Sequence, residues 1–176
     1  RPKPDLVKEC DDPDPDEVAS CGYVDAPLLL VDLHSTFRAG PLRGTALLLW
    51  GRLENAETIT QRNSRLSNAL EAPRTPVAEE ALAAWAELGY DVAPLLGLGN
   101  PHALEPFVRF DYYDTMFDVP AGTFDNPRFE RKVLTAGLAC TLDDAVALKL
   151  DGVHRWFGSS ELRPETSVRL GAGFVF

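Results

Sequence analysis

The stretch SVRLGAGFVF (residues 167–176) alternates apolar side chains with small or polar ones over its whole length. A period of two places successive side chains on opposite faces of a β-strand, so one face of this strand is apolar and the other is not. The fold depends on whether that apolar face meets a protein core or lipid. The apolar positions are Val168, Leu170, Ala172, Phe174 and Phe176.

Patterns of strand length recur along the rest of the chain. Residues 77–93 are ambiguous, because their Ala, Glu and Leu content favours helix whereas their second half alternates; we expect a strand in that half. Residues 55–76 are polar and predict a long loop. The chain therefore predicts seven strands of roughly ten residues, the length that crosses a bilayer at a tilt. Their ranges are 28–38, 42–54, 84–92, 104–116, 129–142, 146–157 and 166–176.

The connections between these strands alternate in length. The set 39–41, 94–103 and 143–145 would lie at one end of the sheet, and the longer set 55–76, 118–127 and 158–165 at the other. Outer-membrane barrels have short periplasmic turns and longer extracellular loops. A soluble β-sandwich has no reason to sort its loops in this way. The sequence thus predicts an all-β, antiparallel transmembrane β-barrel of the outer-membrane type.

Composition narrows the function classes. The chain has 176 residues, with 17 basic and 27 acidic side chains and a net charge of −10, which argues against a nucleic-acid binder. The sequence contains no run of eighteen apolar residues, so no membrane-spanning helix is predicted. Residues 1–26 read as an acidic extracellular loop, and residues 27–176 as barrel strands and loops. Cys10 and Cys21 would form a disulfide in an oxidising compartment or stay free thiols, and both readings remain open.

No catalytic, metal or cofactor site is predicted. His34, His102 and His154 are scattered, without the spacing of a metal-ligand pair. The acidic residues of 11–17 lack the glycine turn of a calcium loop, so a solvated loop is the favoured interpretation. We therefore expect a protein that is not an enzyme.

Charged side chains fall on the polar phase of the predicted strands. A charged inner face is expected only if it holds water, and rings of Arg or Lys favour anions. The alternative is that each base pairs with a neighbouring carboxylate, which would stiffen the wall and select nothing. The predicted pore-lining residues are Arg38, Arg109, Asp111, Arg131, Lys149, Arg155 and Arg169.

Four stretches carry a resemblance to a known family. GYDVAPLLGLG (89–99), LEPFVRFDYYDT (104–115), the run from Val119 to Asp151 and the final VRLGAGFVF look like the C-terminal half of outer-membrane porins of the phosphate-selective (O and P) type. The likeness covers roughly residues 85–176 in order and is weaker over 22–76.

The resemblance implies a bacterial outer-membrane channel with a sixteen-stranded barrel and a homotrimeric assembly. It also implies that the C-terminal residues are the signal read by the barrel assembly machinery. Cys140 and Gly152 depart from the family pattern, which would have aromatic residues there. The basic ladder of the family lies largely outside the matching part, so phosphate selectivity does not carry over. The residues of the predicted assembly signal are Leu170, Phe174 and Phe176.

The functional expectation is passive diffusion of small hydrophilic, anionic solutes through a lipid bilayer. A small closed outer-membrane barrel or surface module with a structural or adhesion role is the competing class, and a soluble β-rich binding module is a third. Seven strands leave two edges, and unpaired backbone groups are costly in hydrocarbon. We therefore expect a C-terminal portion of a larger barrel, in which the strands near 28–38 and 166–176 each keep one edge for absent residues or another chain.

Overall fold

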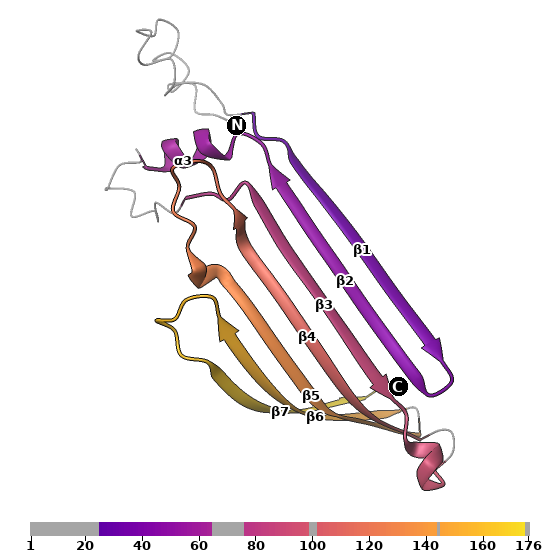
Figure 1. Cartoon of the computed structure of the whole chain (residues 1–176). Coiled ribbons are helices and arrows are strands. Elements are labelled where there is room, and N and C mark those ends of the chain that lie inside the picture. The colour runs from indigo at the N-terminus through magenta and orange to yellow at the C-terminus, as the bar shows by residue number, and fades with distance from the viewer. Residues whose placement is uncertain (1–24, 65–75, 99–101, 144, 175–176) are drawn as a thin grey trace, which may run out of the picture.

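Seven antiparallel strands form one sheet in the computed structural model, which describes residues 25–64, 76–98, 102–143 and 145–174 (Figure 1). Each strand pairs with its neighbours in the sequence, in the order β1 to β7. The prediction of an all-β antiparallel fold with seven strands is confirmed. The strands are β1 (Leu28–Ala39), β2 (Leu42–Leu53), β3 (Glu80–Tyr90), β4 (Ala103–Asp118), β5 (Glu130–Leu142), β6 (Val146–Phe157) and β7 (Glu165–Phe174).

Two local predictions need correction. The segment predicted as a loop over 55–76 contains the helix α3 (Ala56–Ser64). The side chain of Thr60, in this helix, exchanges hydrogen bonds with the backbone of Val77. Strand β3 begins at Glu80 rather than near residue 84. The Ala-rich start of β3 adopts an extended conformation because pairing with β2 satisfies its backbone groups, and this outweighs helix propensity.

Short 3-10 turns complete the description of the connections. They are η2 (Ala93–Leu96), which follows β3, and η3 (Pro127–Phe129), which leads into β5. Helix α3 and the β4–β5 and β6–β7 connections lie at one end of the sheet, and the β1–β2 turn, η2 and the β5–β6 turn lie at the other (Figure 1). We call these the α3 end and the η2 end.

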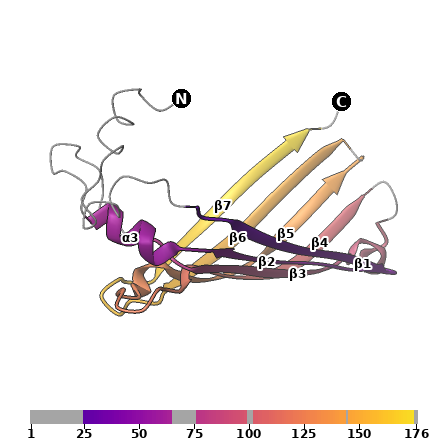
Figure 2. The same cartoon turned by 90° about the horizontal axis from the view of Figure 1, so that it is seen from above.

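The sheet is a single curved layer. In Figure 2, β5 to β7 rise out of the plane of β1 to β3, so the sheet has a concave and a convex face. No described helix or strand covers either face as a second layer, and no large side chain is fully buried among the described residues. Soluble domains bury a sheet face against another layer. The described residues bury neither face of this sheet in that way.

The sheet does not close within the described residues. There β1 pairs only with β2, and β7 only with β6. The prediction that the first and last strands each keep a free edge is confirmed for this part of the chain. Because seven strands alternate in direction, β1 and β7 run the same way along the sheet.

Gly137 of β5 leaves room on the concave face for the side chain of Asp151 of β6. A Cβ at this position would lie 2.6 Å from the Cβ of Asp151 and would also overlap the backbone carbonyl of Leu150. The absence of a side chain therefore lets the Asp151 carboxylate lie against the sheet.

Candidate functional site

The pairing register assigns each strand residue to one of the two faces. Arg109 pairs with Thr135, Thr135 with Val153 and Val153 with Ser167, and paired residues share a face. A move of two residues along a strand, or from a residue to its partner on the next strand, stays on the same face. Such moves from this row reach all the predicted pore-lining residues, so they share one face. Buried Thr135 and Val153 identify it as the concave face, since side chains crowd where a sheet curves inward. These residues are Arg38, Arg109, Asp111, Arg131, Lys149, Arg155 and Arg169.

Five of the seven line one groove of about 420 Å³ on this face, which we call the basic groove. Its polar lining has four basic side chains and one carboxylate, and its floor is Val133, Thr135 and Val153. Arg131 lies beside it, on the strand pair that also holds Tyr113. Arg38 is on β1, at the opposite side of the sheet. The residues of the groove that were predicted from sequence are Arg109, Asp111, Lys149, Arg155 and Arg169.

Arg109 is held in place from two sides. Its Nε donates to Asp111 Oδ1 at 2.9 Å, two residues along the same strand. Its guanidinium lies 4.0 Å from the centre of the Trp85 ring, within the range of a cation–π contact. Arg109 is therefore fixed at the border between β3 and the basic groove.

Asp151 contacts two bases, Arg169 and Lys149, on the side of the groove away from Arg109. Its side chain is only 5% exposed, and Arg169 Nε donates to its Oδ1 at 2.6 Å. The ammonium of Lys149 lies 4.0 Å from the other carboxylate oxygen. Arg155 pairs in the same way with Glu165, at 2.9 Å. Four of the predicted bases, Arg109 included, thus pair with a neighbouring carboxylate, which is the alternative that the sequence left open.

Two of the predicted bases have no carboxylate partner among the described residues. Arg131 donates to the backbone carbonyls of Arg128 and Glu130, and its guanidinium lies 4.5 Å from the centre of the Phe157 ring. Arg38 makes no ion pair with any residue that the structure describes. These two cations remain available to an anion.

A charged network that the sequence did not predict lies toward the η2 end of the concave face. Arg43 Nε donates to both carboxylate oxygens of Glu105 at 3.2 Å, and Arg43 Nη2 donates to Glu87 at 3.1 Å. The Glu105 side chain crosses Gly89, where a Cβ would be in its way. The sequence did not show which face of its strand Arg43 occupies, because Leu47 to Trp50 of the same strand are apolar on both faces.

The concave strand residues are nearly balanced in charge, in a chain of net charge −10. Four bases of the basic groove face three carboxylates, and Arg131 raises the local excess to two positive charges. The arrangement can attract a small anion, although the ion pairs weaken its field.

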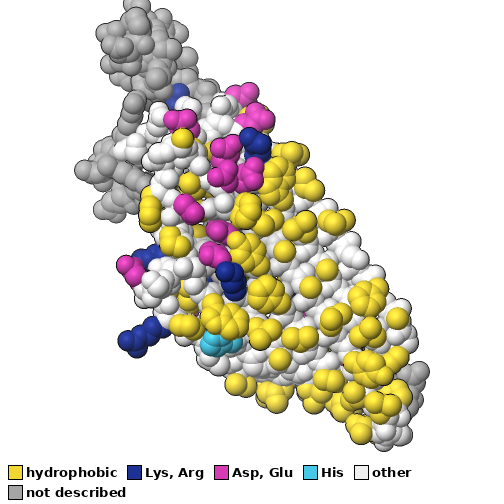
Figure 3. Space-filling model, in the orientation of Figure 1, with side chains coloured by type: hydrophobic (Ala, Val, Ile, Leu, Met, Phe, Trp, Pro, Cys, Tyr) yellow, Lys and Arg dark blue, Asp and Glu magenta, His cyan; other side chains and the backbone are white. Residues whose placement is uncertain are grey.

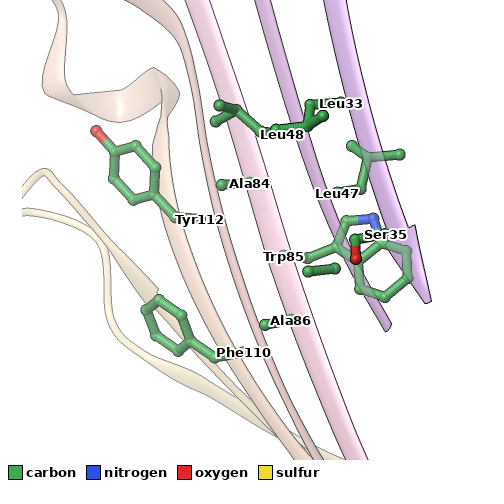
Figure 4. Close-up of a pocket in the computed structure, with 10 residues that line it drawn as sticks. Leu33, Ser35, Leu47, Leu48, Ala84, Trp85, Ala86, Phe110 and Tyr112 are labelled. Atoms are coloured by element: carbon green, nitrogen blue, oxygen red, sulfur yellow. The ribbon is translucent and has the colours of Figure 1, made fainter. Parts of the chain in front are cut away.

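The convex face is apolar. Figure 3 shows this face, with hydrophobic side chains over most of its length and charges gathered toward the α3 end. Figure 4 shows a shallow hollow on it, where Ala84 and Ala86 of β3 leave space between Leu48 and the rings of Phe110 and Tyr112. Leu134, Leu138 and Leu150 are also on this face and more than a third exposed. Exposed apolar areas of this size are typical of surfaces that meet lipid or a protein partner.

The predicted assembly signal lies partly within the described residues. Leu170 and Phe174 are on the convex face of β7, with 81% and 68% of their surface exposed. Phe176 lies outside the described residues, as do Cys10 and Cys21.

Other predictions concern absences. Within the part of the chain that the structure describes, no three His, Cys, Asp or Glu side chains are placed to hold a metal ion. In the same part, no helix has the length and apolar character of a membrane span.

Comparison with known proteins finds no matching family model, no similar curated protein and no similar solved structure. The resemblance to phosphate-selective porins therefore stays a prediction from the sequence.

Proposed function

We propose that this sheet is part of the wall of a transmembrane β-barrel in a bacterial outer membrane, and that its concave face lines a pore for small hydrophilic, anionic solutes. The observation that carries the proposal is the separation of the two faces of a single layer. The concave face carries the basic groove and the convex face is apolar over most of its length, with no described layer covering either. A barrel wall has water on one side and lipid on the other, and it requires this separation.

The length of the apolar face supports the same proposal. Trp156 marks the convex face near the α3 end of β6, and Phe174 pairs with Val146 near the η2 end. The eleven residues from Val146 to Trp156 span ten steps, or roughly 34 Å, along the strand. At a strand tilt of about 40° this corresponds to a height of roughly 26 Å, close to the apolar band of an outer-membrane barrel. Aromatic residues near both ends are typical of the interfaces of such a band.

The free edges of β1 and β7 indicate how the barrel would be completed. In hydrocarbon each unpaired backbone group is costly, so both edges need partner strands. Because β1 and β7 run in the same direction, an antiparallel ring closes only through an odd number of further strands. An even total of strands, as in bacterial single-chain barrels, follows from this parity. Two copies of this sheet inserted in the same direction would instead meet at parallel pairs.

Conductance tests the proposal. The mature protein, purified in detergent from the membranes of the cells that make it, is added to a planar bilayer under a salt gradient. We expect stepwise current increments and a reversal potential displaced toward that of the anion, with heat-denatured protein as the control. Folded protein that inserts without steps would favour the closed barrel with a structural or adhesion role. A protein that is monomeric in buffer without detergent would favour the soluble module.

A further inference from the structure

The concave face carries a group of apolar side chains that a pore for inorganic ions does not need. We call it the apolar strip, and its members are Leu30, Leu47, Leu49, Ala83 and Trp85 of β1, β2 and β3. The pairs Leu47–Trp85 and Leu49–Ala83 place these residues in the same rows as Asp111 and Tyr113 of β4. The strip therefore shares the face of the basic groove and borders it.

We propose that the apolar strip and the neighbouring bases form a binding surface for organic anions that carry a flat apolar group, such as aromatic carboxylates. This inference rests on the proposed pore and names the class of solute. Leu30 is 61% exposed and Leu49 is 37% exposed, although both would face the water of the pore. The Leu30 side chain lies over Gly51, which keeps the surface low at this point. Covering such side chains with an apolar group releases water and is favourable.

A base lies at a suitable distance from the strip. Leu49, Ala83, Tyr113 and Arg131 follow one another across β2, β3, β4 and β5 in a single row of paired residues. Neighbouring strands are about 4.8 Å apart, so the backbone of Arg131 is roughly 10 Å from that of Ala83, with Tyr113 between them. In the structure the Arg131 guanidinium lies over the Phe157 ring of β6, on the side away from the strip. Arg131 has no carboxylate partner among the described residues, so its charge remains available. The Arg109 guanidinium over Trp85 adds a second positive charge at the border of the strip.

The opposite side of the strip favours one orientation of the solute. Asp32 of β1 pairs with Leu49 in the same row, on the side away from Arg131. A carboxylate is repelled at Asp32 and attracted at Arg131. A solute with its ring on Leu49 and Ala83 therefore places its carboxylate toward β5. A cation with the same ring has no comparable position beside Arg131.

The experiment uses the mature protein in planar bilayers and three small probes. Phenylacetate and acetate share a carboxylate, and benzylamine carries an aromatic ring with a positive charge. We expect phenylacetate to reduce the chloride current at a concentration about tenfold lower than acetate, because only its ring covers the leucines. Benzylamine should act only at a higher concentration than phenylacetate, since Arg109 and Arg131 repel it and only Asp32 attracts it.

Variants locate the effect on the strip. The double variant Leu47→Ser and Leu49→Ser should lose most of the difference between phenylacetate and acetate, while keeping single-channel steps. Leu48→Ser, on the convex face between these two positions, is the matched control and should keep the difference. The comparison of probes in the unaltered protein stands even if the double variant does not fold.

Each outcome separates the two proposals. An open channel in which phenylacetate and acetate act at the same concentration would overturn the apolar strip and leave the pore intact. An equal effect of benzylamine and phenylacetate would overturn the role of the bases. Folded protein that inserts without any steps would overturn the pore, and the strip as a pore feature with it.

Discussion

An arginine placed on the convex face of β7 tests the assignment of the two faces most directly. Val168 is on the convex face and 75% exposed, so its side chain would meet lipid in the proposed barrel. It pairs with Gly152, which lies four residues from Trp156 and six from Val146, so it is near the middle of the apolar band. Ser167, the preceding residue, is exposed on the concave face. The two positions share a strand and differ in face.

The expected cost follows from this geometry. An arginine at the midplane on the lipid side of a barrel costs about 2–4 kcal/mol, which lowers the ratio of folded to unfolded protein roughly 30- to 900-fold. Ser167→Arg adds a charge to a water-facing surface and should change stability by less than about 0.5 kcal/mol. Val168→Gln separates the loss of the valine from the burial of a charge, and its cost should lie between the two.

Urea unfolding in lipid vesicles measures the difference. The fluorescence of Trp50, Trp85 and Trp156 reports on β2, β3 and β6, none of which is altered. Equal losses for Val168→Arg and Ser167→Arg, or a larger loss for Ser167→Arg, would refute the assignment of the faces. A Val168→Arg variant that becomes more soluble without detergent at unchanged stability would refute the lipid contact itself.

Three further predictions concern packing and charge on the concave face. Gly137→Ala should destabilise the protein by about 1–3 kcal/mol in urea unfolding, because its Cβ overlaps β6, whereas Gly171→Ala meets nothing within 4 Å and should be neutral. Asp151→Asn leaves two bases without their carboxylate, so the reversal potential should move further toward that of the anion; an unchanged potential would mean that the basic groove is not part of the ion path. Arg43→Met leaves two glutamates close together and should cost about 1–3 kcal/mol, a loss that unfolding in urea measures and that would be absent if the network were not formed.

Much of the fold could be predicted from local sequence patterns. Alternation along a strand reflects the covalent geometry of an extended chain, in which successive side chains point to opposite faces. The pattern from Val168 to Phe174 therefore indicated both a strand and its apolar face, and the structure has that strand. The faces of Arg109, Lys149 and Arg169 were predictable for the same reason. The site they form together was not, because alternation says nothing about distances between strands.

Only the tertiary structure determined the partners of these side chains. Arg43 and Glu105 are 62 residues apart in the chain, and their contact depends on the register of β2, β3 and β4. The apolar strip was hidden for a related reason: Leu47 to Trp50 are apolar on both faces, so the face of Leu49 became evident only from its pairing with Ala83. The start of β3 likewise depended on pairing with β2 rather than on its own helix propensity. Sequence determines the alternation within a strand because it is a local property of the backbone, whereas register arises from hydrogen bonds and side-chain contacts between distant segments, and these exist only once the sheet has formed.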